Sequence, residues 1–123
     1  MLDSCNLIAF VPTLDAERAR DFYQYTLGLR FISDDEFALV FDCNGIMLRV
    51  VRAPKFQPFP FTILGWEVPD IRQYVARLRN AGVTFERFGF FEQDDLAIWT
   101  SPSGSKVAWF KDPDGNTLSI SQH

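Results

Sequence analysis

The sequence contains few side chains of the kinds that act as nucleophiles, bases or metal ligands. Its one histidine, His123, is the last residue and is predicted to fray rather than to serve as a ligand or general base. The two cysteines, Cys5 and Cys43, match no zinc or redox spacing. Because no histidine is placed to activate either sulfur, both are predicted to be ordinary thiols.

Two charged residues in strand-like segments are stronger candidates for a site. Glu67 shares the strand parity of Ile63, so burial would disfavour its charged form and suit it to general-base catalysis. The alternative is an exposed carboxylate at a strand end. Arg49 shares the parity of Met47 in a half-buried strand, where it could anchor a carboxylate, phosphate or phenolate of a ligand. Alternatively, Arg49 pairs with Glu67 or another internal acid.

Thirteen phenylalanines are the main compositional peculiarity, and two groups of them follow neither a helical nor a strand period. These residues are Phe56, Phe59, Phe61, Phe88, Phe90 and Phe91. Loops with this much apolar surface are expected to form a pocket rim or a dimer contact. The other phenylalanines, with Trp66 and Trp109, are predicted to fill the core between helices and sheet. The acidic runs 34–36 and 92–95 are predicted to be solvated loop charges.

Two segments that would position these residues have the start and stop signals of amphipathic helices. Asp15 is placed to cap the first, and Gly28 stands where a left-handed residue is wanted at its end. Asp70 and Gln73 form a capping-box signal for the second, which Gly82 closes. The two halves of the chain therefore begin their helices and end them in the same way.

Strand signals complete the same pattern in both halves. Strands are expected at 7–11, 29–32, 38–43 and 46–50 in the first half, and at 62–66, 83–86, 107–110 and 116–120 in the second. The chain thus resolves into two βαβββ modules, about 5–52 and about 61–122, within one domain covering 1–123. The additional residues of the second half, including 90–100, are expected to add a β excursion at one edge.

Composition restricts the class of protein. A chain of 123 residues with 47% hydrophobic content can bury a core as one domain. The net charge is −4 and the arginines are scattered, which argues against nucleic-acid binding. No apolar run is long enough to span a bilayer and no basic, apolar leader is present, so no membrane partner and a cytoplasmic location are expected.

The order of these features resembles a known superfamily. The helix end Phe22-Tyr23…Leu27-Gly28-Leu29, the paired βαβββ modules and the terminal segment 110–116 (Phe-Lys-Asp-Pro-Asp-Gly-Asn) are similar to the glyoxalase, bleomycin-resistance and extradiol-dioxygenase superfamily, also called the vicinal oxygen chelate superfamily. The resemblance implies an α+β fold whose two modules curl their mixed sheets into one cup, usually in a homodimer. Its enzymes hold a divalent metal with ligands from the first and last strands of each module.

The resemblance also identifies the four positions that would supply those ligands. The first-strand positions fall on Ile8 and Ile63, and the last-strand positions fall on Arg49 and Ser119. Two isoleucines, a cation and a weak hydroxyl cannot hold a divalent ion, which needs several carboxylate, imidazole or thiolate ligands. We therefore expect a member of the superfamily that has no metal and no other cofactor.

A binding protein is the function favoured by this combination. It would be similar to the drug-sequestering resistance proteins and would hold a planar, aromatic and anionic small molecule. The alternative is a glyoxalase-like lyase or isomerase, or a dioxygenase-related enzyme, with a divergent site in which Glu67 is the weak catalytic candidate. The residues expected to contact the ligand are Ile8, Phe10, Met47, Arg49, Phe59, Phe61, Ile63, Trp99 and Ser119.

Overall fold

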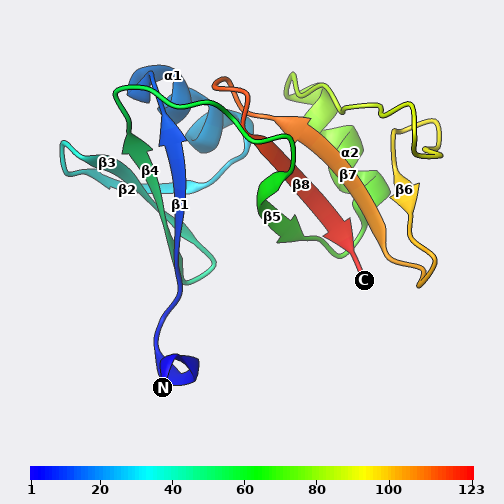
Figure 1. The fold of residues 1–123 in the computed structure, drawn as a ribbon, viewed down its shortest axis with the longest axis horizontal. Helices are drawn as coiled ribbons and strands as arrows, with labels where there is room; N and C mark the ends of the chain where they lie inside the picture. Colours follow the sequence, from blue (N-terminus) through cyan, green and yellow to red (C-terminus); the bar gives the residue numbers. More distant parts are fainter. The chain divides into compact units, whose positions relative to one another are not determined.

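The computed structural model describes all residues 1–123 and has two compact units, Met1–Gln57 and Pro58–His123. We call these the N-terminal and C-terminal units. Each contains one four-stranded mixed sheet and has the order strand, helix and three strands, as Figure 1 shows. The predicted α+β class with two βαβββ modules is therefore confirmed. None of the helices combines the length and the apolar character needed to cross a lipid bilayer.

The sheet of the N-terminal unit has the strand order β1-β4-β3-β2, in which only the pair β1 and β4 is parallel. A short 3-10 turn, η1 (Leu2–Ser4), precedes it. Its elements are β1 (Ile8–Thr13), α1 (Ala16–Arg20), the π-helical continuation η2 (Asp21–Thr26), β2 (Arg30–Asp34), β3 (Ala38–Cys43) and β4 (Ile46–Arg52).

The sheet of the C-terminal unit has the equivalent order β5-β8-β7-β6, in which β5 and β8 are parallel. Its elements are β5 (Thr62–Glu67), α2 (Ile71–Asn80), β6 (Trp99–Thr100), β7 (Lys106–Lys111) and β8 (Thr117–Gln122). In both sheets the first and last strands of the module lie side by side and parallel, which brings the positions singled out by the resemblance onto neighbouring strands.

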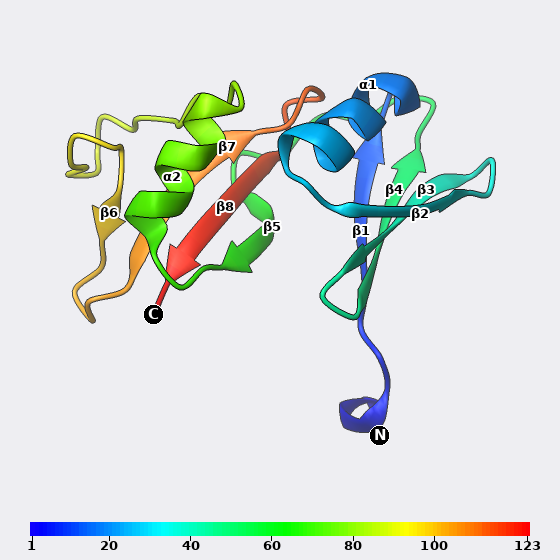
Figure 2. The ribbon, with the colours of Figure 1, turned by 180° about the vertical axis from the view of Figure 1, so that it is seen from behind.

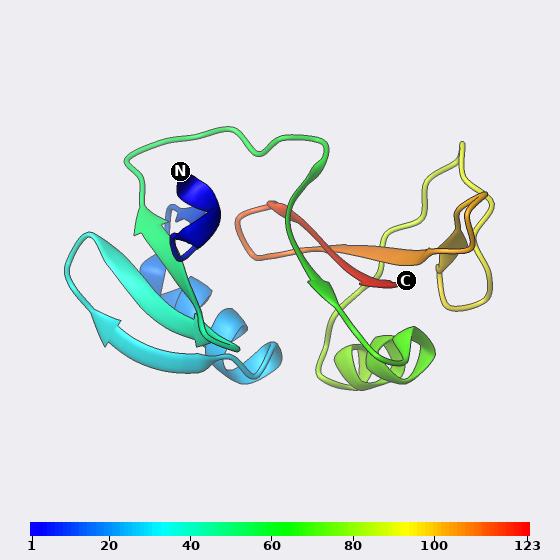
Figure 3. The same ribbon diagram turned by 90° about the horizontal axis from the view of Figure 1, so that it is seen from below.

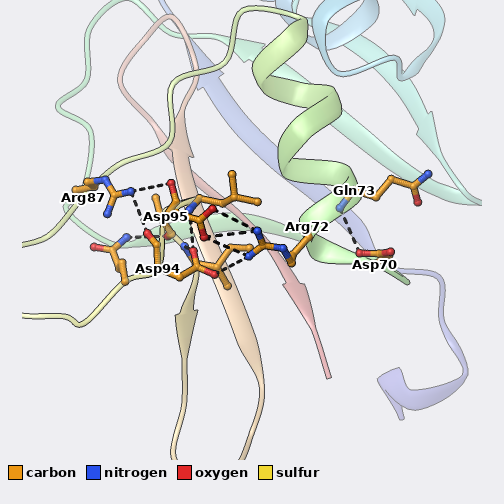
Figure 4. Close-up of polar contacts among 10 residues, drawn as sticks. Asp70, Arg72, Gln73, Arg87, Asp94 and Asp95 are labelled. Carbon is orange, nitrogen blue, oxygen red and sulfur yellow. Dashed lines mark hydrogen bonds and ion pairs between the residues drawn. The ribbon is translucent and has the colours of Figure 1, made fainter.

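Both helices begin and end at the predicted residues. The carboxylate of Asp15 accepts a hydrogen bond from a backbone N–H of α1 at 3.1 Å, and Asp70 accepts one from the Gln73 N–H at 3.2 Å. The Gln73 side chain points away from Asp70, so only half of the predicted capping box forms (Figure 4). Gly28 and Gly82 follow the helices with φ of +74° and +102°, the left-handed conformation that glycine adopts without strain.

The strand predicted at 83–86 is wrong. Only Phe85 forms an isolated bridge, with Phe110 of β7, and the Glu86 N–H donates to the Trp109 carbonyl at 2.8 Å. The remaining length of this β7 edge is paired with β6 instead. The chain leaves the sheet after residue 86 and returns at β6, so the segment expected to add a β excursion instead supplies the strand that is missing at 83–86.

Each sheet has one face covered by its own helix and one face turned away from it, which we call the open face. In the N-terminal unit α1 and η2 pack on β3 and β4 (Figure 2), and α2 lies on one side of β7 and β8 in the C-terminal unit (Figure 3). The fully buried side chains on the helix-covered faces include Val11, Ala19, Tyr23, Phe41, Leu48, Val50, Val75, Ala108, Phe110 and Leu118. Strand alternation then places the residues that precede and follow each of these strand positions on the open faces.

Candidate functional site

An open pocket of about 440 Å³ lies on the open face of the N-terminal sheet, and we call it the N-terminal pocket. Two of the residues predicted to contact a ligand, Ile8 and Met47, line it as directly paired positions on β1 and β4. The apolar lining also includes Ile32 and Val40. This volume is in the range typical of small-molecule sites.

A single row of side chains crosses the sheet beneath this pocket. Ile8 pairs with Met47, Met47 with Asp42, and Asp42 with Arg30, so one residue from each of the four strands lies in the row. All four line the N-terminal pocket. The row is apolar at the β1 and β4 end and charged at the β3 and β2 end. Sequence reasoning missed Arg30, because its cross-strand partners depend on the register of β2, which shifts at a bulge between residues 31 and 33.

The next row along the sheet contains Phe10 and Arg49, which are paired across β1 and β4. Neither lines the N-terminal pocket. The Arg49 guanidinium donates to the Asp35 carboxylate at 2.7 Å, and this contact, with backbone N–H donors, lowers the pKa of Asp35. The acidic partner of Arg49 is thus Asp35 rather than Glu67.

The acidic run 34–36 is exposed, as expected for loop charges, but two of its members are ion-paired rather than merely solvated. Arg52 holds Asp34 with two hydrogen bonds of 2.7 Å, one to each carboxylate oxygen. These bonds, with one from the Glu36 N–H, lower the pKa of Asp34 from 3.8 to about 2. These two ion pairs connect the β2–β3 turn to β4. The paired residues are far apart in the sequence, so helical and strand periodicity does not predict them.

An Arg52→Gln variant should raise the titration midpoint of Asp34 from about 2 towards 3.8, measured by NMR of the carboxyl carbon. The folded-state pKa is below the unfolded value, so the pair stabilises the fold above pH 3.8 and this contribution is lost as the pH falls towards 2. Arg18→Gln, which removes a guanidinium without an ion pair, should leave the midpoint unchanged. A wild-type midpoint near 3.8 would contradict the pairing.

Trp109 does not lie in the core between helix and sheet, so that prediction is wrong. Its neighbours Ala108 and Phe110 are fully buried on the face covered by α2, which places the indole on the open face of the C-terminal sheet. The indole N–H donates to the Thr62 hydroxyl at 3.0 Å. Because β8 lies between β5 and β7, this bond carries the ring across β8, where Trp109 is paired with Ser119 and Thr62 with Thr117.

Ser119 is accordingly a packed position. It is buried, and a Cβ added to its other strand partner, Gly65, would lie 2.8 Å from the serine Oγ. Ile63 falls at the register shift of β5. Glu67 is exposed at the end of β5, so it lacks the burial on which its proposed role as a base depends.

Aromatic rings extend the open face beyond Trp109. Phe91 stacks on Trp109 with centroids 5.5 Å apart and an interplanar angle of 7°, and its centroid lies 4.8 Å from that of Trp99. Phe59 and Phe61 stack on each other at 5.1 Å and remain 60% and 58% exposed. Phe59 lines a second pocket, of about 370 Å³, on the C-terminal unit. The predicted contact residues of this unit therefore do not converge on one pocket.

Polar contacts fix the segment that carries Phe91 and Trp99. Arg72 of α2 donates to Asp94 at 3.1 Å and contacts Asp95 at 3.4 Å, while Arg87 donates to the backbone carbonyls of both residues, as Figure 4 shows. The side chain of Gln93 also bonds to three backbone groups, one each of residues 86, 88 and 97. These acidic residues are exposed, as predicted for loop charges, and they also support the aromatic segment.

The histidine and the two cysteines do not line the N-terminal pocket. Both imidazole nitrogens of His123 lie 3.0 Å from a serine hydroxyl, those of Ser121 and Ser105, so the ring is held rather than frayed. Cys5 is exposed and Cys43 is half-buried, and they form no disulfide.

The four positions that would hold a metal do not fit a divalent ion. Ile8 lines an apolar part of the N-terminal pocket, Arg49 is committed to Asp35, and Ser119 offers one buried hydroxyl between Gly65 and Trp109. No group of three or more histidine, cysteine, aspartate or glutamate side chains converges elsewhere in a way that could hold a metal. Metal-dependent chemistry therefore has no support from the residues at these positions.

Comparisons with solved structures identify the fold. A member of the glyoxalase/bleomycin resistance protein/dioxygenase superfamily from Sphaerobacter thermophilus is 21% identical, covers 100% of both chains and has a TM-score of 0.77. TnmS3, an antibiotic binding protein from Streptomyces sp. CB03234, is 27% identical over 99% of this chain and 98% of its own, with a TM-score of 0.75. Lactoylglutathione lyase from Agrobacterium tumefaciens is 16% identical over 97% and 93%, with a TM-score of 0.73.

A search of curated proteins returned no match. The family model of the glyoxalase/bleomycin resistance protein/dioxygenase superfamily, in contrast, matches residues 4–120, which is nearly the whole chain. The match includes both βαβββ modules. The chain therefore belongs to the glyoxalase/bleomycin resistance protein/dioxygenase superfamily.

Proposed function

We propose that this protein binds a planar, mostly apolar small molecule without the help of a metal ion and without transforming it. The observation that carries the proposal is the N-terminal pocket itself. Ile8 stands there where a metal-binding relative would have a ligand, and Met47 lies directly beside it. An apolar floor gains its binding energy from removing the apolar surface of a ligand from water.

The chemistry of the pocket lining supports capture rather than turnover. No histidine or cysteine lines the pocket, and its one carboxylate, that of Asp42, accepts a hydrogen bond from the Gly45 N–H at 3.2 Å. The lining therefore offers no base paired with a nucleophile, as acyl-transfer and elimination chemistry would require. Glu67, the candidate base from sequence, belongs to the other unit and is exposed.

The comparison with TnmS3 supports the same class of function. TnmS3 is an antibiotic binding protein, and its 27% identity extends over almost the whole chain. Fold alone does not transfer a function, so the argument rests on the lining of the pocket and not on the name of a relative. The homodimer and the cytoplasmic location expected from the sequence stay predictions.

A methyl-resolved NMR titration tests this proposal. We expect 2-naphthoate and its neutral amide, 2-naphthamide, to shift the methyl resonances of Ile8, Ile32, Val40 and Met47 in metal-free protein. The methyls of Val11 and Leu48, on the helix-covered face, serve as the internal control. Shifts confined to the C-terminal unit, or no saturable shift with either compound at millimolar concentration, would refute the proposed site.

A further inference from the structure

We infer that Arg30 gives the N-terminal pocket a preference for ligands that carry a carboxylate or phenolate at one end. The inference rests on the proposed function and adds the charge class of the ligand. Arg30 lies in the same cross-strand row as Met47 and Ile8, at the opposite end. A ligand lying along this row would contact Met47 and Ile8 with its rings and Arg30 with its acidic group.

Most other arginines of the N-terminal sheet and helix already have partners. Arg49 is bonded to Asp35 and Arg52 to Asp34. Arg20 donates to Gln24 at 3.0 Å, and its guanidinium lies 3.7 Å from the centroid of a phenylalanine ring. The Arg30 side chain makes no hydrogen bond or ion pair, and it is the only basic residue in the lining of the N-terminal pocket.

Asp42, the direct cross-strand partner of Arg30, does not neutralise it through a contact. The Asp42 carboxylate is used by the β3–β4 turn, where it accepts the hydrogen bond from Gly45. The guanidinium therefore keeps all of its donors for a ligand, in the planar arrangement that suits a carboxylate. Asp42 also contributes a repulsion that an anionic ligand must overcome, so the two residues act in opposite directions on the same ligand.

The geometry of the sheet limits the length of the ligand. Neighbouring strands lie about 4.8 Å apart, so the row from β1 to β2 spans about 14 Å between backbones. A two-ring or three-ring aromatic body covers the apolar half of this distance and leaves its acidic substituent within reach of a long arginine side chain. A small aliphatic acid would contact Arg30 or the apolar floor but not both.

The test compares 2-naphthoate with 2-naphthamide in wild-type protein and in Arg30→Gln. Because Arg30 is exposed, we expect Arg30→Gln to weaken 2-naphthoate about threefold to tenfold and 2-naphthamide less than about twofold. Arg49→Gln is the matched control and should change neither affinity by more than about twofold, since its guanidinium is committed to Asp35. Asp42→Asn, which keeps an acceptor for the turn, should tighten the binding of 2-naphthoate alone.

The outcomes distinguish failure of the inference about Arg30 from failure of the proposed function. If wild-type protein binds both compounds at the Ile8 and Met47 methyls but Arg30→Gln weakens both equally, or neither, the inference about Arg30 is overturned and the proposed function stands. If neither compound binds the wild type, both fail together. A selective loss with Arg49→Gln in place of Arg30→Gln would assign the anchor to Arg49 and overturn the inference as well.

Discussion

Replacing Trp109 by alanine is expected to lower the free energy of unfolding by about 3 kcal/mol, near the lower end of the range for large aromatic truncations because the residue is half-buried. The indole stacks on Phe91 and donates to Thr62 across β8. Its loss removes the centre of the aromatic surface on the C-terminal unit. Chemical denaturation followed by circular dichroism measures the change.

Trp109→Phe is the matched control. A phenylalanine keeps a ring against Phe91 but loses the hydrogen bond to Thr62, so we expect a cost of about 1 kcal/mol from the bond, with a further loss from the smaller ring. A loss below about 1 kcal/mol for Trp109→Ala would place the indole in solvent and contradict its packing on Phe91 and its bond to Thr62.

Gly65→Ala should destabilise the protein by about 1 kcal/mol, the lower end of the range for an added methyl group in a core, because Gly65 is exposed and the close contacts of the methyl group are all with Ser119. The new Cβ would lie 2.8 Å from the Oγ of Ser119 and 3.4 Å from its carbonyl oxygen. Ser119 is itself buried, so its Oγ has little room to move away from the added methyl group. Thermal unfolding of the variant measures the loss.

Two further variants isolate the cause of that loss. Ser119→Ala in the Gly65→Ala background removes the clashing oxygen, so the pair should show a coupling energy of about 1 kcal/mol or more in favour of the double variant. Gly89→Ala introduces the same methyl group where nothing lies within 4 Å and should be close to neutral. Equal losses for Gly65→Ala with and without Ser119 would exclude the clash as the cause.

The fold could be predicted because its signals are local. Asp15 and Asp70 each satisfy a backbone N–H within the first turn of their helix, and the glycines that follow both helices have positive φ. Repetition of these signals in both halves of the chain was sufficient to predict two βαβββ modules. The strand predicted at 83–86 does not form for a non-local reason. The edge of β7 with which it would have paired is mostly occupied by β6, which comes later in the chain.

The site could be predicted only in part because it depends on register and on distant contacts. Ile8 was found through the superfamily resemblance and Met47 through its strand parity with Arg49, and the structure places both in one pocket. Residues 107–110 are all apolar, so alternation could not assign Trp109 to a face. Arg49 and Arg30 could be distinguished only by their contacts, since an ion pair with Asp35 across a turn leaves no trace in the sequence pattern.

The central claim, that the protein captures its ligand without a metal, is tested most directly by calorimetric titration of 2-naphthoate into chelator-treated protein, repeated with zinc, magnesium or manganese added. The account predicts one binding site per chain, the same affinity in all four conditions, and no stoichiometric metal in the purified protein by elemental analysis. It would be contradicted if about one equivalent of a divalent metal co-purified with the chain and its removal abolished ligand binding.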